Sequence, residues 1–348
     1  MTLVLDRRRC LRCCTVRATA GSTPFPAPTP LEVHRLPVQF AADGRRVITR
    51  LFNPGGDARA RSIIERVCRF SESETEEMLD RLRRDFGHRH EDLETAFEES
   101  YDDIAALAGV PENLSHKRRL LIGSYFTMEY SIASAALFNP SIVKHRNQWN
   151  LPEGAVRFIL SFRATGEGHV SCAVFRTGII TSDHSVQMDP SKPFSHRVRT
   201  SPDRQYDKPL FDHKLRDIGI DETTIAAVLG RLPDQFTMVD LEHAIAAART
   251  AEPEMLYPEE TWEGILWLAQ SNYELRLSKD ADASEVVIFP YSNNESHGIE
   301  DLRMVRFAED DGEVTYFGTY TATDGRRILP QIMETRDFLR IGIHTLNG

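Results

Sequence analysis

The sequence has no apolar run that approaches the roughly 20 residues needed to span a bilayer. It also lacks a basic stripe: the 348 residues carry 42 Lys and Arg against 52 Asp and Glu, for a net charge of -10. These absences argue against a membrane partner and a nucleic-acid partner. With 41% hydrophobic and 27% charged residues, the chain has the composition of a soluble globular protein, and we expect it to be cytoplasmic and to handle a small polar substrate.

Cysteines are few, and their arrangement does not predict a disulfide framework. Their number is odd and three lie close together near the N-terminus, at Cys10, Cys13, Cys14, Cys68 and Cys172. The Cys10-x-x-Cys13 spacing is compatible with zinc, but no second pair follows at a useful distance. Free thiols in a flexible leader are therefore the better interpretation, and we predict neither a metal site nor an organic cofactor.

Residues 1–30 are predicted to form a disordered leader. Arginines are followed by prolines at alternate positions from 24 to 30, and the apolar core of a secretory signal is missing. The composition is similar to that of a transit peptide, and a start codon placed too far upstream would give the same pattern. The leader is left out of the fold prediction.

Residues 31–130 are predicted to contain a strand pair followed by helices. Strands are expected at 36–40 and 47–52, with Asp43-Gly44 as the turn between them. Ser71 and Glu74 have the spacing of a capping box, which predicts that a helix begins there. Apolar residues at helical spacing continue this pattern, and a further helix is expected from about 115 to 136.

Residues 131–348 are predicted to be rich in strands, with a helical insertion at about 195–270. Alternating apolar and polar residues predict strands at 156–163 and 170–177. A hairpin is expected from strands at 302–307 and 314–322, because an acidic, glycine-containing turn separates two segments of high strand propensity.

The loop that leads into this hairpin is rich in ionisable side chains. Glu295, His297, Glu300 and Asp301 precede or begin the strand, and Arg303 follows two residues later. Crowded carboxylates suit acid/base chemistry, because neighbouring charges and partial burial move their pKa values apart. A solvated acidic loop is the alternative interpretation.

Several segments, in order, resemble glycoside hydrolase family 130, the β-mannoside phosphorylases and mannosidases. The matching segments are 138–141 (FNPS), 160–165 (LSFRAT), 298–303 (GIEDLR), 316–322 (YFGTYTA) and 334–338 (ETRDF). The resemblance runs from about residue 125 to the C-terminus. Leu302 departs from the family pattern, which usually has proline after the Glu-Asp pair.

The resemblance implies a mainly β fold, a five-bladed β-propeller with a funnel-shaped site. It implies that Asp301 is the general acid in an inverting reaction. Four residues are expected to bind the substrate: Asn139, Arg163, Glu300 and Arg303. Arg336 is a candidate for binding phosphate, although an exposed structural arginine is equally compatible with the sequence.

The length available from residue 131 limits this prediction. Residues 131–348 without the helical insertion are enough for about three four-stranded blades. We therefore expect a C-terminally incomplete propeller or a fragment of a longer protein. The leading functional prediction is a phosphorylase that uses inorganic phosphate as co-substrate to cleave β-mannoside oligosaccharides. An inverting β-mannosidase and a non-catalytic carbohydrate-binding or scaffold protein are the alternatives, and a homo-oligomer is left open.

Overall fold

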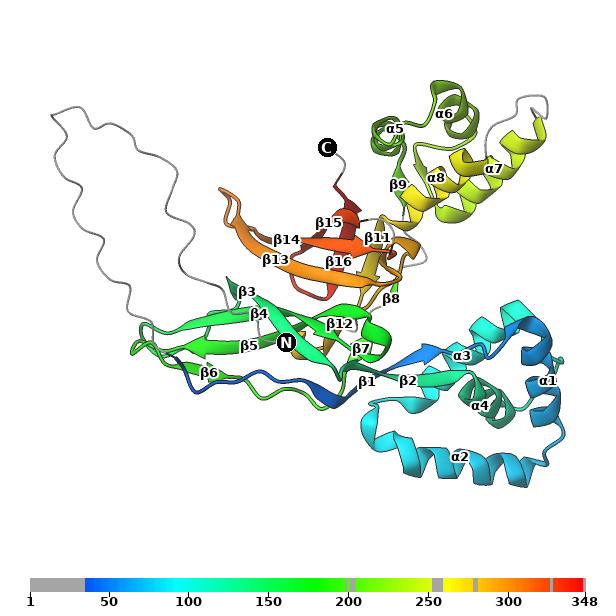
Figure 1. The fold of residues 1–348 in the computed structure, drawn as a ribbon, viewed down its shortest axis with the longest axis horizontal. Coiled ribbons are helices and arrows are strands. Elements are labelled where there is room, and N and C mark those ends of the chain that lie inside the picture. Colours follow the sequence, from blue (N-terminus) through cyan, green and yellow to red (C-terminus); the bar gives the residue numbers. More distant parts are fainter. Residues whose placement is uncertain are drawn as a thin grey trace, which may run out of the picture. The chain divides into compact units, whose positions relative to one another are not determined.

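The computed structural model describes residues 35–197, 199–200, 205–251, 259–277, 281–325 and 328–346 (Figure 1). All the elements considered below belong to the unit Val38–Gly348. The leader predicted at residues 1–30 lies outside the described residues. Helices account for 38% and strands for 32% of the structure, so the fold is mixed α/β and the prediction of a mainly β protein is wrong.

Four helices follow the first strand, and each covers part of a shared apolar core. They are α1 (Gly56–Cys68), α2 (Glu72–Phe86), α3 (Leu93–Ala108) and α4 (His116–Tyr125), with a short 3-10 turn η1 (Gly87–Arg89) after α2. Ile64, Leu79, Ile104 and Leu120 are at most 2% exposed in this core. The predicted capping box at Ser71 is confirmed, because its hydroxyl accepts from the Glu74 amide while the Glu74 carboxylate accepts from the Ser71 amide.

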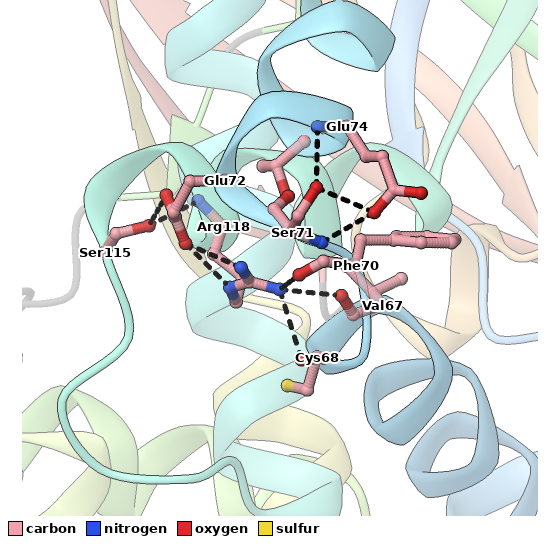
Figure 2. Close-up of polar contacts among 9 residues, drawn as sticks. Val67, Cys68, Phe70, Ser71, Glu72, Glu74, Ser115 and Arg118 are labelled. Carbon is pink, nitrogen blue, oxygen red and sulfur yellow. Dashed lines mark hydrogen bonds and ion pairs between the residues drawn. The ribbon is translucent and has the colours of Figure 1, made fainter.

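The side chain of Arg118 on α4 holds the end of α1 and the start of α2 together (Figure 2). Its Nη1 donates to the carbonyls of Val67, Cys68 and Phe70 at 3.0, 3.2 and 2.7 Å. Its Nη2 pairs with Glu72 at 2.6 Å on the first turn of α2. One buried guanidinium thus supplies donors to carbonyls at and just after the C-terminus of α1, where the helix itself provides few.

Replacing Arg118 with methionine is expected to lower the free energy of unfolding by about 2–4 kcal/mol, because three carbonyls each lose one hydrogen bond from the guanidinium and Glu72 loses its ion pair. Urea denaturation measures the loss, and hydrogen exchange at the α1 and α2 amides locates it. Lys117→Met is the matched control: the neighbouring Lys117 pairs with Glu76 across the same helices, but both side chains are about half exposed. The control should cost less than about 1 kcal/mol, and equal losses in the two variants would contradict the role given to Arg118.

The strand pair of the N-terminal region differs from the prediction. Strand β1 (Asp43–Leu51) pairs antiparallel with β2 (Thr127–Ala133), whereas residues 36–40 form no strand. The helix predicted from 115 to 136 ends at Tyr125, and β2 replaces its second half. Local spacing did not identify the partner of β1, because the two paired strands lie about 80 residues apart in the chain and only tertiary pairing joins them.

Twelve of the other described strands form one mixed sheet. Its main order is β3-β4-β5-β13-β14-β15-β16-β11-β8, with β6 and β12 paired to β5 and β7 paired to β12. The bounds are β3 (Ala136–Lys144), β4 (Val156–Thr165), β5 (Ser171–Ile180), β6 (Val186–Met188), β7 (His196–Arg197), β8 (Arg199–Thr200), β11 (Tyr273–Arg276), β12 (Val286–Ile288), β13 (Gly298–Ala308), β14 (Val314–Thr323), β15 (Ile328–Thr335) and β16 (Arg340–Thr345). The predicted hairpin is confirmed as β13–β14.

The propeller prediction is wrong: within the described residues the strands form no closed ring of blades. Two antiparallel groups, β3–β6 and β13–β16, resemble blades in their strand order. A parallel bridge between Ser171 and Gly298 nevertheless joins β5 to β13 in one continuous sheet. Short alternating strands have the same sequence pattern in both architectures, so only the join between the two groups distinguishes them.

Four helices lie where the helical insertion was predicted, together with the short strand pair β9 (Tyr206–Asp207) and β10 (Gln235–Phe236). The helices are α5 (Lys208–Asp217), α6 (Glu222–Leu229), α7 (Met238–Ala251) and α8 (Glu259–Gln270). They share their own apolar core, in which Trp262 and Ile265 are buried. Among the described helices, none has the length and apolar character that a membrane crossing requires.

Candidate functional site

Two irregularities, one in β3 and one in β13, define the candidate site; the two strands are not paired with each other in the sheet. In β3 the pairing with β4 shifts between Phe138 and Ser141, and in β13 the pairing with β14 shifts between Glu300 and Arg303. Asn139 and Asp301 lie within these bulges and have left-handed backbone conformations, with φ of 52° and 57°. Asn and Asp tolerate this conformation better than other non-glycine residues. Bulges redirect side chains away from the regular alternation of a strand.

The two bulges contact each other directly. The side-chain amide of Asn139 donates to Oδ1 of Asp301, 162 positions away in the chain. The Arg303 guanidinium donates to the carbonyl of Pro140 at 2.7 Å, and the Met304 amide donates to Oγ of Ser141 at 3.0 Å. These bonds hold the Asp301 carboxylate at a defined place without burying it: its side chain is 46% exposed.

Arg163 on β4 joins both carboxylates of the Glu-Asp pair. Its Nη2 pairs with Glu300, and its Nη1 lies 3.5 Å from Oδ1 of Asp301. Its Nε donates to Oγ of Ser171 at 3.0 Å, and the guanidinium lies over the ring of Phe138, 5.1 Å from the centroid. The planar, multidentate guanidinium makes all four contacts at once, which a lysine could not do.

The structure therefore brings five of the six predicted site residues together. The cluster of Asn139, Arg163, Glu300, Asp301 and Arg303 is called the bulge cluster below. Sequence reasoning gave no role of their own to Ser171 and to the ring of Phe138. The strand register supplies the missing signal for Ser171. It is paired with Thr165, two residues beyond Arg163, at the end of the β4–β5 hairpin where the turn joins the two strands.

Arg336 does not lie in the bulge cluster. Thr335, its neighbour, is paired with Tyr316, which is paired with Arg306 on β13. Arg306 is five residues beyond Asp301, which corresponds to roughly 16 Å along the strand. Arg336 instead pairs with Glu313 at 2.5 Å near the other end of the hairpin, and both side chains are more than half exposed.

The acidic loop before β13 separates into two environments. Glu295 is 0% exposed, and its carboxylate accepts from the hydroxyls of Tyr273 and Tyr320 and from the amides of Tyr291 and Ser292. Burial raises the pKa of both Tyr273 and Tyr320 well above the usual value, and the Glu295 charge adds to this. Both hydroxyls therefore keep their protons and remain donors, which makes Glu295 an internal anchor of the loop.

His297, by contrast, is exposed, and its backbone amide bonds to the carbonyl of Thr323 on β14. It closes the base of the hairpin through its backbone. Within the described residues, no group of three or more His, Cys, Asp or Glu is arranged to hold a metal ion.

The fold and the bulge cluster define a mixed α/β protein with a partly exposed carboxylate pair held by one arginine. Comparison of the chain with protein-family models, curated proteins and solved structures gives no match in any of the three.

Proposed function

We propose that the protein is a carbohydrate-active enzyme, an inverting glycoside phosphorylase acting on β-mannosides, with Asp301 as general acid. The observation that carries this proposal is the bulge cluster, in which Asn139 and Arg163 orient a half-exposed aspartate. Amide and guanidinium groups at the rim of such a site suit the binding of sugar hydroxyls. The ordered segments that resemble glycoside hydrolase family 130 include every residue of the bulge cluster.

In the proposed reaction the carboxyl group of Asp301 gives its proton to the glycosidic oxygen, acting directly or through a substrate hydroxyl. The bond between that oxygen and the anomeric carbon breaks, and a phosphate oxygen attacks the carbon from the opposite face. The products are mannose 1-phosphate with inverted configuration and the released sugar. Arg303 lies on β13 two residues from Asp301, whereas Arg336 lies outside the bulge cluster. Arg303 is therefore the better candidate for contacting phosphate.

Hydrolysis is the second candidate, and in it Glu300 would have to activate the attacking water molecule. An inverting hydrolase needs a second carboxylate about 6.5–9.5 Å from the acid, to leave room for water. Glu300 is bound to Arg163 and lies next to Asp301 in the chain. It is therefore less suited to activating a water molecule than a free carboxylate would be, which favours phosphate as the nucleophile.

Sugar binding without catalysis is the third candidate. It is favoured by the way the charges of the bulge cluster already satisfy one another, since Arg163 contacts both Glu300 and Asp301 and Arg303 is bonded to Pro140. Such a cluster could hold sugar hydroxyls with no proton transfer.

Incubation of the full chain with β-1,2- and β-1,4-mannobiose, with and without inorganic phosphate, separates the three candidates. Release of mannose 1-phosphate only when phosphate is present is the expected result. Mannose released equally well without phosphate would support hydrolysis. Binding of either disaccharide by calorimetry with no product, if Arg163→Lys weakens that binding, would support a non-catalytic role of the bulge cluster. No binding at all would overturn the assignment of a mannoside substrate.

We place this activity in the cytoplasm, in keeping with free thiols at Cys68 and Cys172. Burial raises the pKa of Cys172 to about 12 and also raises that of Cys68. Both thiols therefore stay protonated near neutral pH, and neither is suited to act as a nucleophile.

A further inference from the structure

A cavity of about 390 Å³ lies beside the end of the β13–β14 hairpin that is remote from the bulge cluster. It is lined by residues of the loop 145–149, by Tyr316 on β14 and by the turn Arg336–Phe338. Its volume is within the roughly 300–1,000 Å³ usual for small-molecule sites. Arg336 alone among these residues has a predicted role, so this cavity is separate from the proposed reaction site.

One wall of the cavity presents an indole ring to solvent. Trp149 is 79% exposed, although its loop is tightly held. The Trp149 amide donates to Oδ1 of Asn147 at 2.9 Å, and the Gln148 amide group donates to the carbonyls of His145 and Arg157 at 2.6 and 2.9 Å. Gln148 also accepts from the Arg157 amide at 3.1 Å, which fastens the loop to the start of β4. The ring is thus presented on an ordered loop, which lowers the entropy lost when a ligand packs on it.

The turn Arg336–Phe338, which also lines the cavity, is likewise held by hydrogen bonds and ring packing. Phe338 has a left-handed φ of 63° and is 4% exposed, with its ring packed 5.0 Å from the ring of Tyr316. Its amide donates to Oγ1 of Thr335 at 2.9 Å. The Asp337 carboxylate accepts from the amides of Leu339 and Arg340 at 2.8 and 2.9 Å through one oxygen. The second carboxylate oxygen takes no part in these two bonds.

The charges around the cavity nearly cancel. Arg336 pairs with Glu313, while Arg146 and Asp337 contribute one charge of each sign. Burial lowers the pKa of His145, so its imidazole is neutral near pH 7. The lining therefore offers both donors and acceptors with little net charge, which suits a neutral ligand that carries many hydroxyl groups better than it suits an anion.

We propose that this cavity is a second carbohydrate-binding site, in which a neutral hexopyranose packs its apolar face on the Trp149 ring. Arg146 and Asn147 donate to its hydroxyls from one wall, and Asp337 accepts from the other. An indole is suited to this role because it combines a large apolar face with a polar edge. The site binds sugar independently of the reaction at Asp301 and would hold an oligosaccharide chain at a distance from the reacting bond.

The test is a titration of the full chain with β-1,4-mannobiose, cellobiose and maltose. Binding is measured by calorimetry and by the protection of tryptophan fluorescence against quenching by iodide. At least one disaccharide is expected to bind and to protect Trp149. Trp149→Ala should weaken that binding about tenfold or more, and Trp149→Tyr should restore much of it. Phe307→Ala is the matched control. Phe307 is an aromatic residue on β13 that is 48% exposed but does not line the cavity.

The proposal is overturned if none of the three disaccharides binds, if Trp149→Ala binds as well as the unchanged chain, or if Phe307→Ala weakens binding equally. Binding of glucose 6-phosphate in preference to the neutral sugars would also overturn it, since the cavity would then be an anion site. Asp301→Asn should leave this binding unchanged, so failure of the proposed reaction and failure of this second site give different results.

Discussion

Replacing Asp301 with asparagine is expected to reduce the rate of mannobiose cleavage about 10²–10⁴-fold, the usual contribution of a general acid. Asparagine removes the proton that the glycosidic oxygen needs. It keeps the shape of the side chain, and it tolerates the left-handed φ of 57° at this position. Its carbonyl oxygen can still accept from the amide of Asn139. The loss should therefore appear in kcat, while the stability of the fold changes little.

A substrate that does not need protonation sharpens this prediction. The leaving group of 4-nitrophenyl β-mannoside departs as a stabilised anion, so Asp301→Asn should slow its cleavage far less than that of mannobiose. Asp310→Asn is the matched control, because it makes the same chemical change in the exposed turn at the far end of the hairpin. Full activity of the Asp301 variant on mannobiose would refute the acid assignment. Equal losses on both substrates would show that Asp301 positions the sugar without protonating it.

Replacing Glu295 with glutamine, which exchanges one carboxylate oxygen for an NH₂ group, is expected to lower the free energy of unfolding by about 2–4 kcal/mol. The buried carboxylate accepts from four donors, two hydroxyls and two amides, and the Tyr273 hydroxyl lies within reach of both of its oxygens. Glutamine places an NH₂ group where the structure requires an acceptor, so at least one of these donors faces another donor. Hydrogen bonds to a charged acceptor are also stronger than those to a neutral one.

Urea denaturation measures this effect, with Glu313→Gln as the control. The Glu313 side chain is 55% exposed and pairs with Arg336 on the surface, so its loss should cost less than about 1 kcal/mol. Tyr320→Phe should recover part of the stability lost in Glu295→Gln, because it removes one of the donors left without an acceptor. A Glu295→Gln variant as stable as the control would show that the buried carboxylate is not the anchor of the loop.

The Asn293–Ala322 segment shows how far local sequence reasoning reaches. Its hairpin was predicted correctly, because strand propensity and turn composition depend only on neighbouring residues. In the sequence, the loop before it is a single group of ionisable residues. The structure divides that group, burying Glu295 against Tyr273 and Tyr320 while leaving Asp301 about half exposed. Nothing in the loop itself distinguishes these carboxylates, since the burial of Glu295 depends on strands β11 and β14.

By itself, the sequence determined what short-range chemistry controls. It specified the capping box at Ser71, the helical insertion that the structure shows between Lys208 and Gln270, and the strand that carries Arg163. The tertiary structure extended β13 back over Asp301 and decided which strands meet. The Asn139–Asp301 and Arg163–Glu300 contacts span 162 and 137 positions, and the parallel bridge at Ser171 leaves the sheet open where a propeller was predicted. Such contacts depend on the register and joining of whole strands, and strands of similar pattern can be joined in more than one way.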